Sequence, residues 1–397
     1  MLVIFFVNSI RFYQTDAMWQ QLNWLEATET GLRSTIGDDW ASSSSSSAKP
    51  GSPMGHSGTS GHTYIGALLQ DKRVTYNIPS LEDLTRPTEA SATSATCIGN
   101  DEAIMATVYN RNNTNERTEE VTKRYKIPFM IHQTAKSRCV IAEYNYTSNQ
   151  WKNLEHYKYY FHDDRAVDEL LYGQYYPEFP QLTAVAKNCL NSDAARIDLW
   201  RLLVLYLYGG IYADIDSMPT GFSHVTLRED DEAFFTVDKE SLPSQYFMAV
   251  KPRHPFLYLA LNMVLGRLLS QDDSLRYNPV AVTGPGVYRG VLSRFGSMGP
   301  NPTRRLLDKD WKVKPGQYMG LGDSKLRVVG TADKHENLVR RDRFTSKKDE
   351  AYRLMNMTHF VKQMRNRSGI SCEEAIFRWQ KRLREEADTQ ATTEGWA

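Results

Sequence analysis

Hydrophobic residues gather in the middle of the chain, where short apolar runs alternate with longer segments of helical spacing. Five runs have the length and the polar flanks of buried strands, at 125–134, 157–161, 211–213, 234–237 and 246–250. Helical spacing occurs at 162–172, 194–208 and 255–269. This alternation predicts an α/β fold with an open sheet, whose ligand lies at the carboxyl ends of its strands.

Residues 194–208 differ from the other helical segments because they are apolar on most sides. A helix of this kind is buried. Gly209 and Gly210 end it, and the strand at 211–213 follows at once. Near the carboxyl end, Ser371 and Glu374 form a capping box before apolar residues at helical spacing, which predicts a second, packing helix.

The amino-terminal third is polar. Residues 41–61 are a Ser/Gly/Pro tract that cannot bury enough side chain to offset the entropy of ordering it, so we interpret them as a linker. Little regular structure is expected before about residue 121, apart from a helix around 18–29. The expected organisation is a largely disordered region 1–120, a folded domain 121–365, and a carboxyl-terminal helix and tail 366–397.

The overall charge is close to zero, with 48 Lys and Arg against 47 Asp and Glu among 397 residues. A balanced charge excludes proteins that gather nucleic acid or anionic membranes through a strong overall field, so no nucleic-acid partner is expected. The 41% of hydrophobic residues supply a sizeable core, while a mean hydropathy of −0.52 indicates long polar stretches as well.

Four cysteines lie far apart in the sequence, without a CxxC pair, at Cys97, Cys139, Cys189 and Cys372. This excludes a zinc ribbon and a thioredoxin-like site, and leaves open buried thiols or as many as two disulfides. No apolar stretch reaches the roughly 18 residues of a membrane-spanning helix. The apolar run at 2–7 is shorter than a signal sequence core, so membrane association is expected only if a signal anchor is missing from this chain.

Asp214 and Asp216 directly follow the strand at 211–213. Side chains at i and i+2 of an extended segment point to the same side, so the two carboxylates would share one site. Like charges at this separation are costly unless a cation or a proton joins them, and Mn²⁺ or Mg²⁺ takes one or two carboxylates together with phosphate oxygens. A second triplet at 308–310 has a polar, turn-like setting without a preceding strand, so we expect no metal there.

Asp198 and Arg201 are three residues apart and share a face of the apolar helix at 194–208. An ion pair within the helix is the simple interpretation. Burying such a pair costs several kcal/mol unless ligands or hydrogen bonds satisfy both groups. A carboxylate that binds sugar hydroxyls and a guanidinium that binds sugar or phosphate oxygens would use it.

Four ordered segments resemble glycosyltransferase family 32. The run IDLWRLLVLYLYGGIYADID is similar to the sugar-binding region with its DXD motif, and IPFMIHQT is similar to the strand that opens the family's catalytic domain. FMAVKPRHPF and TGPG are similar to two later segments. The family includes initiating α-1,6-mannosyltransferases of the fungal Golgi and several glycosphingolipid and capsule sugar transferases.

The resemblance implies a GT-A type nucleotide-diphospho-sugar transferase fold with a Rossmann-like sheet, with the catalytic domain at 121–365, and a single divalent metal. Asp214 and Asp216 would be catalytic and hold Mn²⁺ (or Mg²⁺). The residues that would contact the donor are Asp198, Arg201, Tyr212, His132 and Gln133. The chain departs from the family pattern at Ile197 and Gln245, and its closing His-x-x-Gly-Ser-Trp pattern is missing. His359 is the nearest match and a further candidate metal ligand.

These observations together predict a metal-dependent, retaining glycosyltransferase of the Golgi lumen or membrane. It would transfer mannose from GDP-mannose to a glycan or glycolipid acceptor. A UDP-sugar donor and an inactive glycan-binding module stay open as alternatives. Asp238 is only a weak candidate for a covalent nucleophile. Glycosylation sequons at 112, 145, 356 and 366 fit a luminal location without adding weight.

Overall fold

The structure is a computed structural model that describes residues 78–87, 102–103, 108–110, 122–190, 192–237, 243–269, 279–288, 290–291, 318–321, 324–330, 338–341 and 371–394. All of them lie in the second of two compact units, residues 60–397. Several predictions fall outside the described residues, namely the helix at 18–29, the linker at 41–61, the triplet 308–310, Asp238 and His359.

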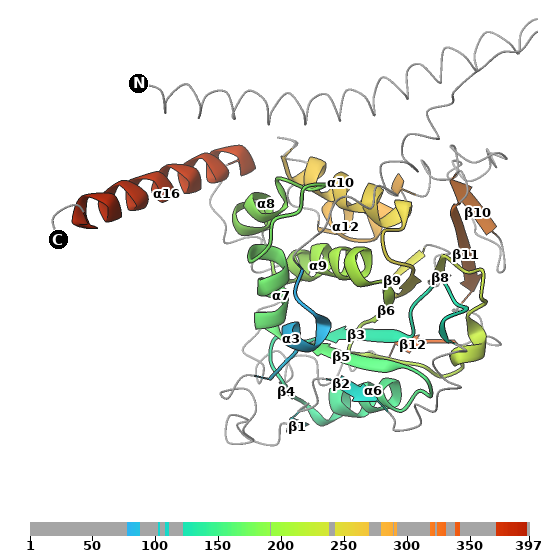
Figure 1. The fold of residues 1–397 in the computed structure, drawn as a ribbon. Coiled ribbons are helices and arrows are strands. Elements are labelled where there is room, and N and C mark those ends of the chain that lie inside the picture. The colour runs from blue at the N-terminus through green and yellow to red at the C-terminus, as the bar shows by residue number, and fades with distance from the viewer. Residues whose placement is uncertain are drawn as a thin grey trace, which may run out of the picture. The chain divides into compact units, whose positions relative to one another are not determined.

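An open, mixed sheet of eight strands forms the centre of the fold (Figure 1). Its order is β10 (Tyr318–Leu321), β11 (Ser324–Gly330), β8 (Ala233–Val237), β9 (Pro243–Val250), β6 (Gly210–Ala213), β3 (Met130–Thr134), β5 (Lys158–His162) and β2 (Val108–Asn110). β3 is parallel to both β5 and β6, whereas β9 is antiparallel to β6 and β8. The predicted α/β class with an open sheet is confirmed.

Helices cover both faces of this sheet (Figure 1). One face packs on α7 (Asp164–Tyr172), α8 (Leu182–Cys189), α9 (Asp193–Tyr208) and α10 (Pro255–Leu269). The other packs on α6 (Ala142–Lys152). The alternation of strand side chains explains the two cores, because Ile211 and Ala213 belong to one cluster and Tyr212 to the other.

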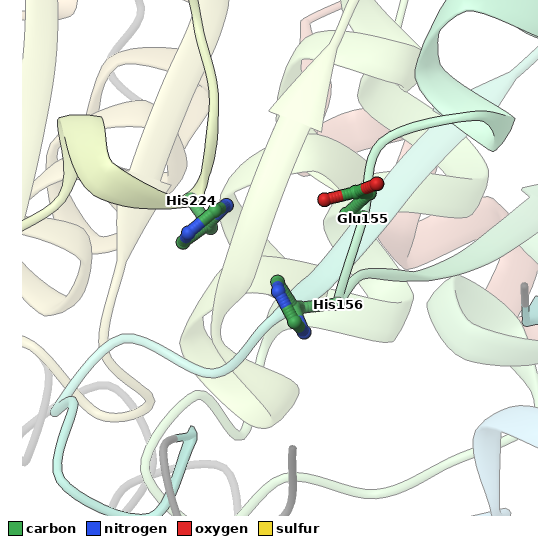
Figure 2. A group of neighbouring side chains, drawn as sticks. All are labelled: Glu155, His156 and His224. Atoms are coloured by element: carbon green, nitrogen blue, oxygen red, sulfur yellow. The ribbon is translucent and has the colours of Figure 1, made fainter. Parts of the chain in front are cut away.

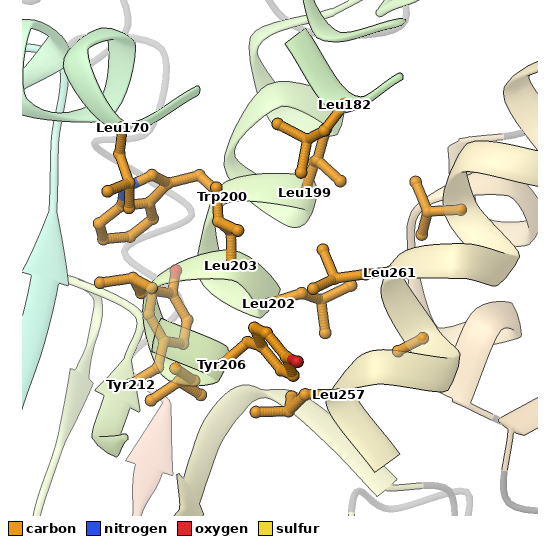
Figure 3. Close-up of a cluster of buried hydrophobic side chains, with 14 of the residues drawn as sticks. Leu170, Leu182, Leu199, Trp200, Leu202, Leu203, Tyr206, Tyr212, Leu257 and Leu261 are labelled. Atoms are coloured by element: carbon orange, nitrogen blue, oxygen red, sulfur yellow. The ribbon is translucent and has the colours of Figure 1, made fainter. Parts of the chain in front are cut away.

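Helix α9 lies at the centre of the larger core (Figure 3). Ser192 caps its amino terminus by accepting a hydrogen bond from the Ala195 amide, and every side chain from Leu199 to Tyr206 is buried. Figure 3 shows Trp200 on the side of Leu170 and Leu202 on the side of Leu261. The predicted buried helix is confirmed, and its burial fixes Asp198 and Arg201 in place.

The predicted strands and helices occur within a few residues of their expected bounds, with one instructive difference. The strand expected at 125–134 begins only at Met130. Pro128 has no amide hydrogen, and the Met130 amide bonds back to the Pro128 carbonyl at 2.9 Å instead of joining the sheet. The apolar residues before β3 still enter the core, since Ile127 and Phe129 are buried.

Three short described elements precede residue 121, in the region where little regular structure is expected. Strand β2 adds to the edge of the main sheet beside β5. Helix α3 (Leu81–Leu84) buries both of its leucines. The Arg138 guanidinium, which is itself buried, donates to the Thr85 carbonyl and pairs with Asp163. Residues from the amino-terminal third thus complete the folded unit.

Two further pairs of short strands flank the sheet. β1 (Glu102–Ala103) pairs with β4 (Cys139–Val140), and β7 (Ser217–Met218) pairs with β12 (Arg340–Arg341). A disulfide joins Cys189 to Cys372 and ties α16 (Cys372–Glu394) to α8. Cys139 is also disulfide-bonded. No helix among the described residues has both the length and the apolar character to span a bilayer.

Gly209 and Gly210 reverse the chain between α9 and β6, and both have positive φ values of 69° and 92°. A Cβ at Gly209 would lie 2.5 Å from the Pro252 Cδ. A Cβ at Gly210 would lie 2.7 Å from the Met130 carbonyl oxygen. Only glycine fits both requirements, so this turn is a fixed point between the buried helix and the residues that follow β6.

Replacing Gly210 with Ala is expected to lower the free energy of unfolding by at least about 1–2 kcal/mol, from the left-handed backbone alone. The contact with Met130 adds to this loss. Urea unfolding followed by circular dichroism measures it. Gly290→Ala is the control, because its new Cβ would meet only the flexible ends of Met263 and Arg267. Equal stability of the two variants would contradict the prediction.

Candidate functional site

The candidate site lies at the carboxyl end of β6, beside β3. The chain runs from β3 to β5 on one side and then returns through three helices to β6 on the other side. The strand order therefore reverses between β3 and β6. Ligands in open α/β sheets bind at such a switch point, outside the carboxyl ends of the strands. Asp214 is the first residue after β6.

Residues 214–217 form a tight turn between β6 and β7, in which the Ser217 amide donates to the Asp214 carbonyl at 3.0 Å. The backbone at Asp214 and Asp216 is therefore a turn, and the extended segment that the sequence predicted there is wrong. The turn nevertheless brings both carboxylates to one cation, the guanidinium of Arg341.

Side chains from two elements hold this turn through its backbone. From α6, the Thr147 hydroxyl donates to the Ile215 carbonyl, and the Trp151 indole donates to the Ser217 carbonyl at 2.8 Å. From β3, the Gln133 amide donates to the Asp214 carbonyl at 3.1 Å, while its own oxygen accepts from Tyr159. The turn is thus anchored through its backbone, and the Asp214 and Asp216 carboxylates make their own contacts, with Arg341 among them.

Arg341 on β12 lies between the two carboxylates. Its guanidinium is 3.2 Å from Asp214 and 3.0 Å from Asp216. The Asp214 carboxylate raises the pKa of Arg341 against the opposing effect of partial burial, and Asp216 adds to the increase. The two carboxylates therefore already share a cation in this structure. Their oxygen donor set fits the hard divalent ions Mn²⁺ and Mg²⁺.

Arg201 reaches Asp214 from the opposite side. It contacts Asp198 at 3.2 Å and Asp214 at 3.5 Å, and it donates to the Gln245 carbonyl at 2.9 Å. Burial by itself lowers the pKa of Arg201, but the Tyr212 ring system and the two carboxylates outweigh it and raise the pKa. An ion pair within α9 is thus only part of its role, because the guanidinium joins α9 to the turn after β6.

Asp198 is nearly buried, and its second oxygen accepts a hydrogen bond from the Thr283 hydroxyl at 2.9 Å. Burial raises the pKa of Asp198 to about 6, although Arg201 and Thr283 oppose the shift. The Gln245 amide donates to the Thr283 carbonyl at 3.1 Å. These contacts bring α9, the first half of β9 and the TGPG stretch to one place.

Tyr212, on strand β6, completes the cluster. Its hydroxyl donates to the Asp214 carboxylate at 2.7 Å, and the Arg201 guanidinium lies 4.6 Å from its ring centroid. Burial raises the pKa of Tyr212 well above its ordinary value, so the hydroxyl stays protonated and donates. Tyr212 is buried and orients Asp214.

His132 has a different role from the predicted contact with a donor. It is fully buried in β3, and its two ring nitrogens lie 3.1 Å from the His162 ring and 3.0 Å from the Gly209 carbonyl. Both ring nitrogens are thus occupied, and neither is left to contact a nucleotide-sugar donor. We therefore revise its assignment to a structural one, in which it holds the glycine turn. Gln133 is fully buried as well and positions Asp214.

Acidification is expected to destabilise the fold through His132. Burial lowers its pKa to about 4, partly offset by the hydrogen bond to Gly209, whereas an unfolded histidine titrates near about 6.5. The unfolded state binds more protons between these values, so the free energy of unfolding falls with falling pH, by up to roughly 3 kcal/mol. Urea titrations at about pH 7 and about pH 4.5 measure the loss.

His132→Asn is the matched variant for this pH prediction. It is expected to be less stable at neutral pH, because the ring contacts are lost, yet to lose less stability on acidification. Part of the dependence of the free energy of unfolding on pH should remain in this variant, because burial lowers the pKa of His162 too. An unchanged slope in the variant would assign the acid sensitivity to other groups.

Several site residues were missed from the sequence. Arg341 stands in a run of charged residues that is typical of a solvated surface. Thr147 and Trp151 lie in a helix whose buried face is largely polar. Thr283 opens the TGPG segment, so the family resemblance could have identified it.

Comparison with known protein families gives a match that spans the turn after β6. Residues 132–231 match the family model of the glycosyltransferase sugar-binding region containing DXD motif. This part of the chain is similar to a glycosyltransferase sugar-binding region. The predicted resemblance is confirmed at this level. The matched sugar-binding region contains all but one of the predicted site residues, namely His132, Gln133, Asp198, Arg201, Tyr212, Asp214 and Asp216. Gln245, Thr283 and Arg341 lie beyond it and complete the site in space.

Comparison with curated protein sequences gave no significant match. Among solved structures, a chain described as "PaToxG Glycosyltransferase" is similar over 46% of this chain and 79% of its own length. The sequence identity is 16% and the TM-score is 0.33. The contacts described above are taken from this structure and do not depend on that distant similarity.

Proposed function

We propose that the protein is a metal-dependent, retaining glycosyltransferase of GT-A type that transfers mannose from GDP-mannose to a glycan or glycolipid acceptor in the Golgi. One observation carries the proposal. The carboxylates of Asp214 and Asp216 share a single cation, and Asp198 and Arg201 lie directly beside them. This arrangement joins a site for a divalent ion to groups that bind sugar hydroxyls and phosphate.

Asp214 and Asp216 would hold Mn²⁺ or Mg²⁺. When bound, such an ion neutralises the charge that builds up on the departing diphosphate. The fit is supported by Arg341, whose guanidinium is a cation already accommodated between the two carboxylates. Thr147, Trp151 and Gln133 hold the turn rigid, so little reorganisation is needed on binding.

Asp198 and Arg201 would bind the donor sugar and its phosphate or ribose. Thr283 donates a hydrogen bond to Asp198, Arg201 donates one to the Gln245 carbonyl, and Gln245 in turn donates to the Thr283 carbonyl. Arg201 and Arg341 place two positive charges on either side of Asp214, which favours a dianionic leaving group. Acceptor attack on the same face of the sugar then depends mainly on positioning by these groups.

The choice of mannose depends on the resemblance to the initiating α-1,6-mannosyltransferases. Secretory localisation is supported by the Cys189–Cys372 disulfide and by the bonded state of Cys139, because disulfides persist in oxidising compartments.

The test is donor hydrolysis and transfer by the full chain with GDP-mannose and with UDP-sugars, each with and without Mn²⁺. Turnover of GDP-mannose only with Mn²⁺ is the expected result, and NMR of the product reports whether the anomeric configuration is retained. If the protein turned over a UDP-sugar and not GDP-mannose, the proposed donor would be wrong and a UDP-sugar would take its place. Glycan binding without turnover of any donor would contradict the proposal of an enzyme and favour a glycan-binding module.

Arg341→Gln is expected to act in opposite directions on metal and donor. Removing the guanidinium removes a cation that competes for Asp214 and Asp216, so Mn²⁺ alone should bind more tightly. Donor affinity should fall because a positive charge beside the diphosphate is lost. Electron paramagnetic resonance measures free Mn²⁺, and calorimetry measures the donor. Arg340→Gln, on the neighbouring exposed residue, is the control. Parallel changes of both affinities would contradict the prediction.

A further inference from the structure

Glu155, His156 and His224 form a cluster outside the sugar-binding site (Figure 2). Glu155 and His156 lie in the turn between α6 and β5, and His224 opens the short 3-10 helix η2 (His224–Thr226) after β7. One potential ligand atom from each residue lies within 4.8 Å of the others. Figure 2 shows the two imidazole rings and the carboxylate on facing loops.

The polar atoms of this cluster are not held by hydrogen bonds or ion pairs to other described residues. Within the part of the chain that the structure describes, neither imidazole nor the carboxylate makes a hydrogen bond or an ion pair. The two rings meet edge to face, with centroids 4.6 Å apart. Ring nitrogens and a carboxylate oxygen that converge in this way can all be satisfied by one cation.

The two loops are held by the core beneath them. Tyr157 follows His156 and is buried, and Phe222 precedes η2 and is buried as well, with their ring centroids 6.1 Å apart. Ser223 and Thr226 cap η2 by reciprocal hydrogen bonds. His156 has a φ of 71°, a conformation that few residues other than glycine adopt and in which histidine is enriched. The ligand atoms are therefore presented by fixed backbone, as a preformed site requires.

This cluster is at the opposite edge of the sheet from Asp214. β3 is parallel to β5 and β6, so the residues before β5 and the residues after β6 are at opposite ends of their strands. Glu155 and His156 precede β5, whereas Asp214 follows β6. The cluster is thus a separate site, independent of the proposed sugar transfer.

We propose that Glu155, His156 and His224 bind one Zn²⁺ ion that ties the α6–β5 turn to the segment after β7. Two imidazoles and a carboxylate are a donor set that suits Zn²⁺, whereas the oxygen-only site at Asp214 suits Mn²⁺ or Mg²⁺. Water completes the coordination, because the three residues lie at the surface. The ion links two loops that otherwise meet through Tyr157 and Phe222.

The test is calorimetric titration of the full chain with Zn²⁺ in excess Mg²⁺, which occupies oxygen-only sites. One Zn²⁺ per chain is expected. Binding should be lost in His156→Gln/His224→Gln and be at least tenfold weaker in Glu155→Gln. Co²⁺ is the spectroscopic probe, and its visible absorption should report nitrogen ligands in the native protein alone. Zn²⁺ should also raise the melting temperature of the native protein and not that of the double variant.

Glu229→Gln is the matched control, because it removes an exposed carboxylate from the same segment outside the cluster. It should bind Zn²⁺ as the native protein does. All variants should melt together in a chelator, since the three side chains make no hydrogen bonds that folding depends on. If the double variant does not fold, Glu155→Gln decides. Unchanged Zn²⁺ binding in that variant, or no binding by the native protein, would overturn the proposal.

Discussion

Asp214→Asn or Asp216→Asn is expected to reduce sugar transfer by a factor of about 10² or more while the protein stays folded. Each change removes one charged oxygen ligand from the shared cation. The fold survives because the turn is anchored through backbone carbonyls, and Asn keeps the size of Asp. After Asp214→Asn, Arg201 still contacts Asp198 and the Gln245 carbonyl. Transfer rates and melting temperatures of the same preparations measure both effects.

The control for this prediction is the second triplet, as Asp308→Asn/Asp310→Asn. It has no strand before it in the sequence pattern, and it lies outside the matched region at 132–231. Transfer by this variant should equal that of the native protein. Survival of Mn²⁺-dependent transfer in Asp214→Asn would refute the metal assignment, and loss of metal dependence in the control would move it to the second triplet.

Arg201→Met is expected to abolish transfer and also to destabilise the fold by about 3–5 kcal/mol. It leaves the buried Asp198 carboxylate without its guanidinium. Adding Asp198→Leu removes the unpaired charge, so the double variant should regain most of the stability without regaining transfer. Thermal melts and donor titrations on the two variants separate the structural role of the pair from its role in binding.

Arg201→Lys refines this second prediction. A lysine keeps the charge, but a single ammonium cannot contact Asp198, Asp214 and the Gln245 carbonyl as the planar guanidinium does. Donor affinity should fall although the net charge of the site is unchanged. If the Asp198→Leu/Arg201→Met variant were stable and fully active, the ion pair would have only a structural role. Asp214 and Asp216 would then be the remaining site residues.

Sequence patterns predicted the buried parts of the fold well, because burial leaves a periodic record in the sequence. Helix α9 is apolar on most sides and strand β6 is apolar throughout, and both were placed within one residue of their bounds. Helix α6 was missed, since the side chains it buries are Thr147, Ser148 and Trp151, two of them polar. Thr147 and Trp151 are nevertheless the residues that hold the turn after β6.

His132 shows why a motif does not decide a role. The resemblance placed it beside the donor, yet β3 lies between β5 and β6, and its side chain is sealed in the core. Its two neighbours there, His162 and the Gly209 carbonyl, come from other elements. Burial is a property of the assembled sheet, which the local sequence around His132 does not record.

The sequence by itself determined the α/β class, the buried helix before the glycine turn, and the four charged residues Asp198, Arg201, Asp214 and Asp216. These features follow from periodicity, from glycine as a helix end and from residue spacing, which are all local. Only the tertiary structure decided how the charges are used. Arg341 reaches Asp214 because β12 pairs with β7, and Thr283 reaches Asp198 across the fold. Such contacts form between segments far apart in the chain, so their partners are fixed by packing and not by any local pattern.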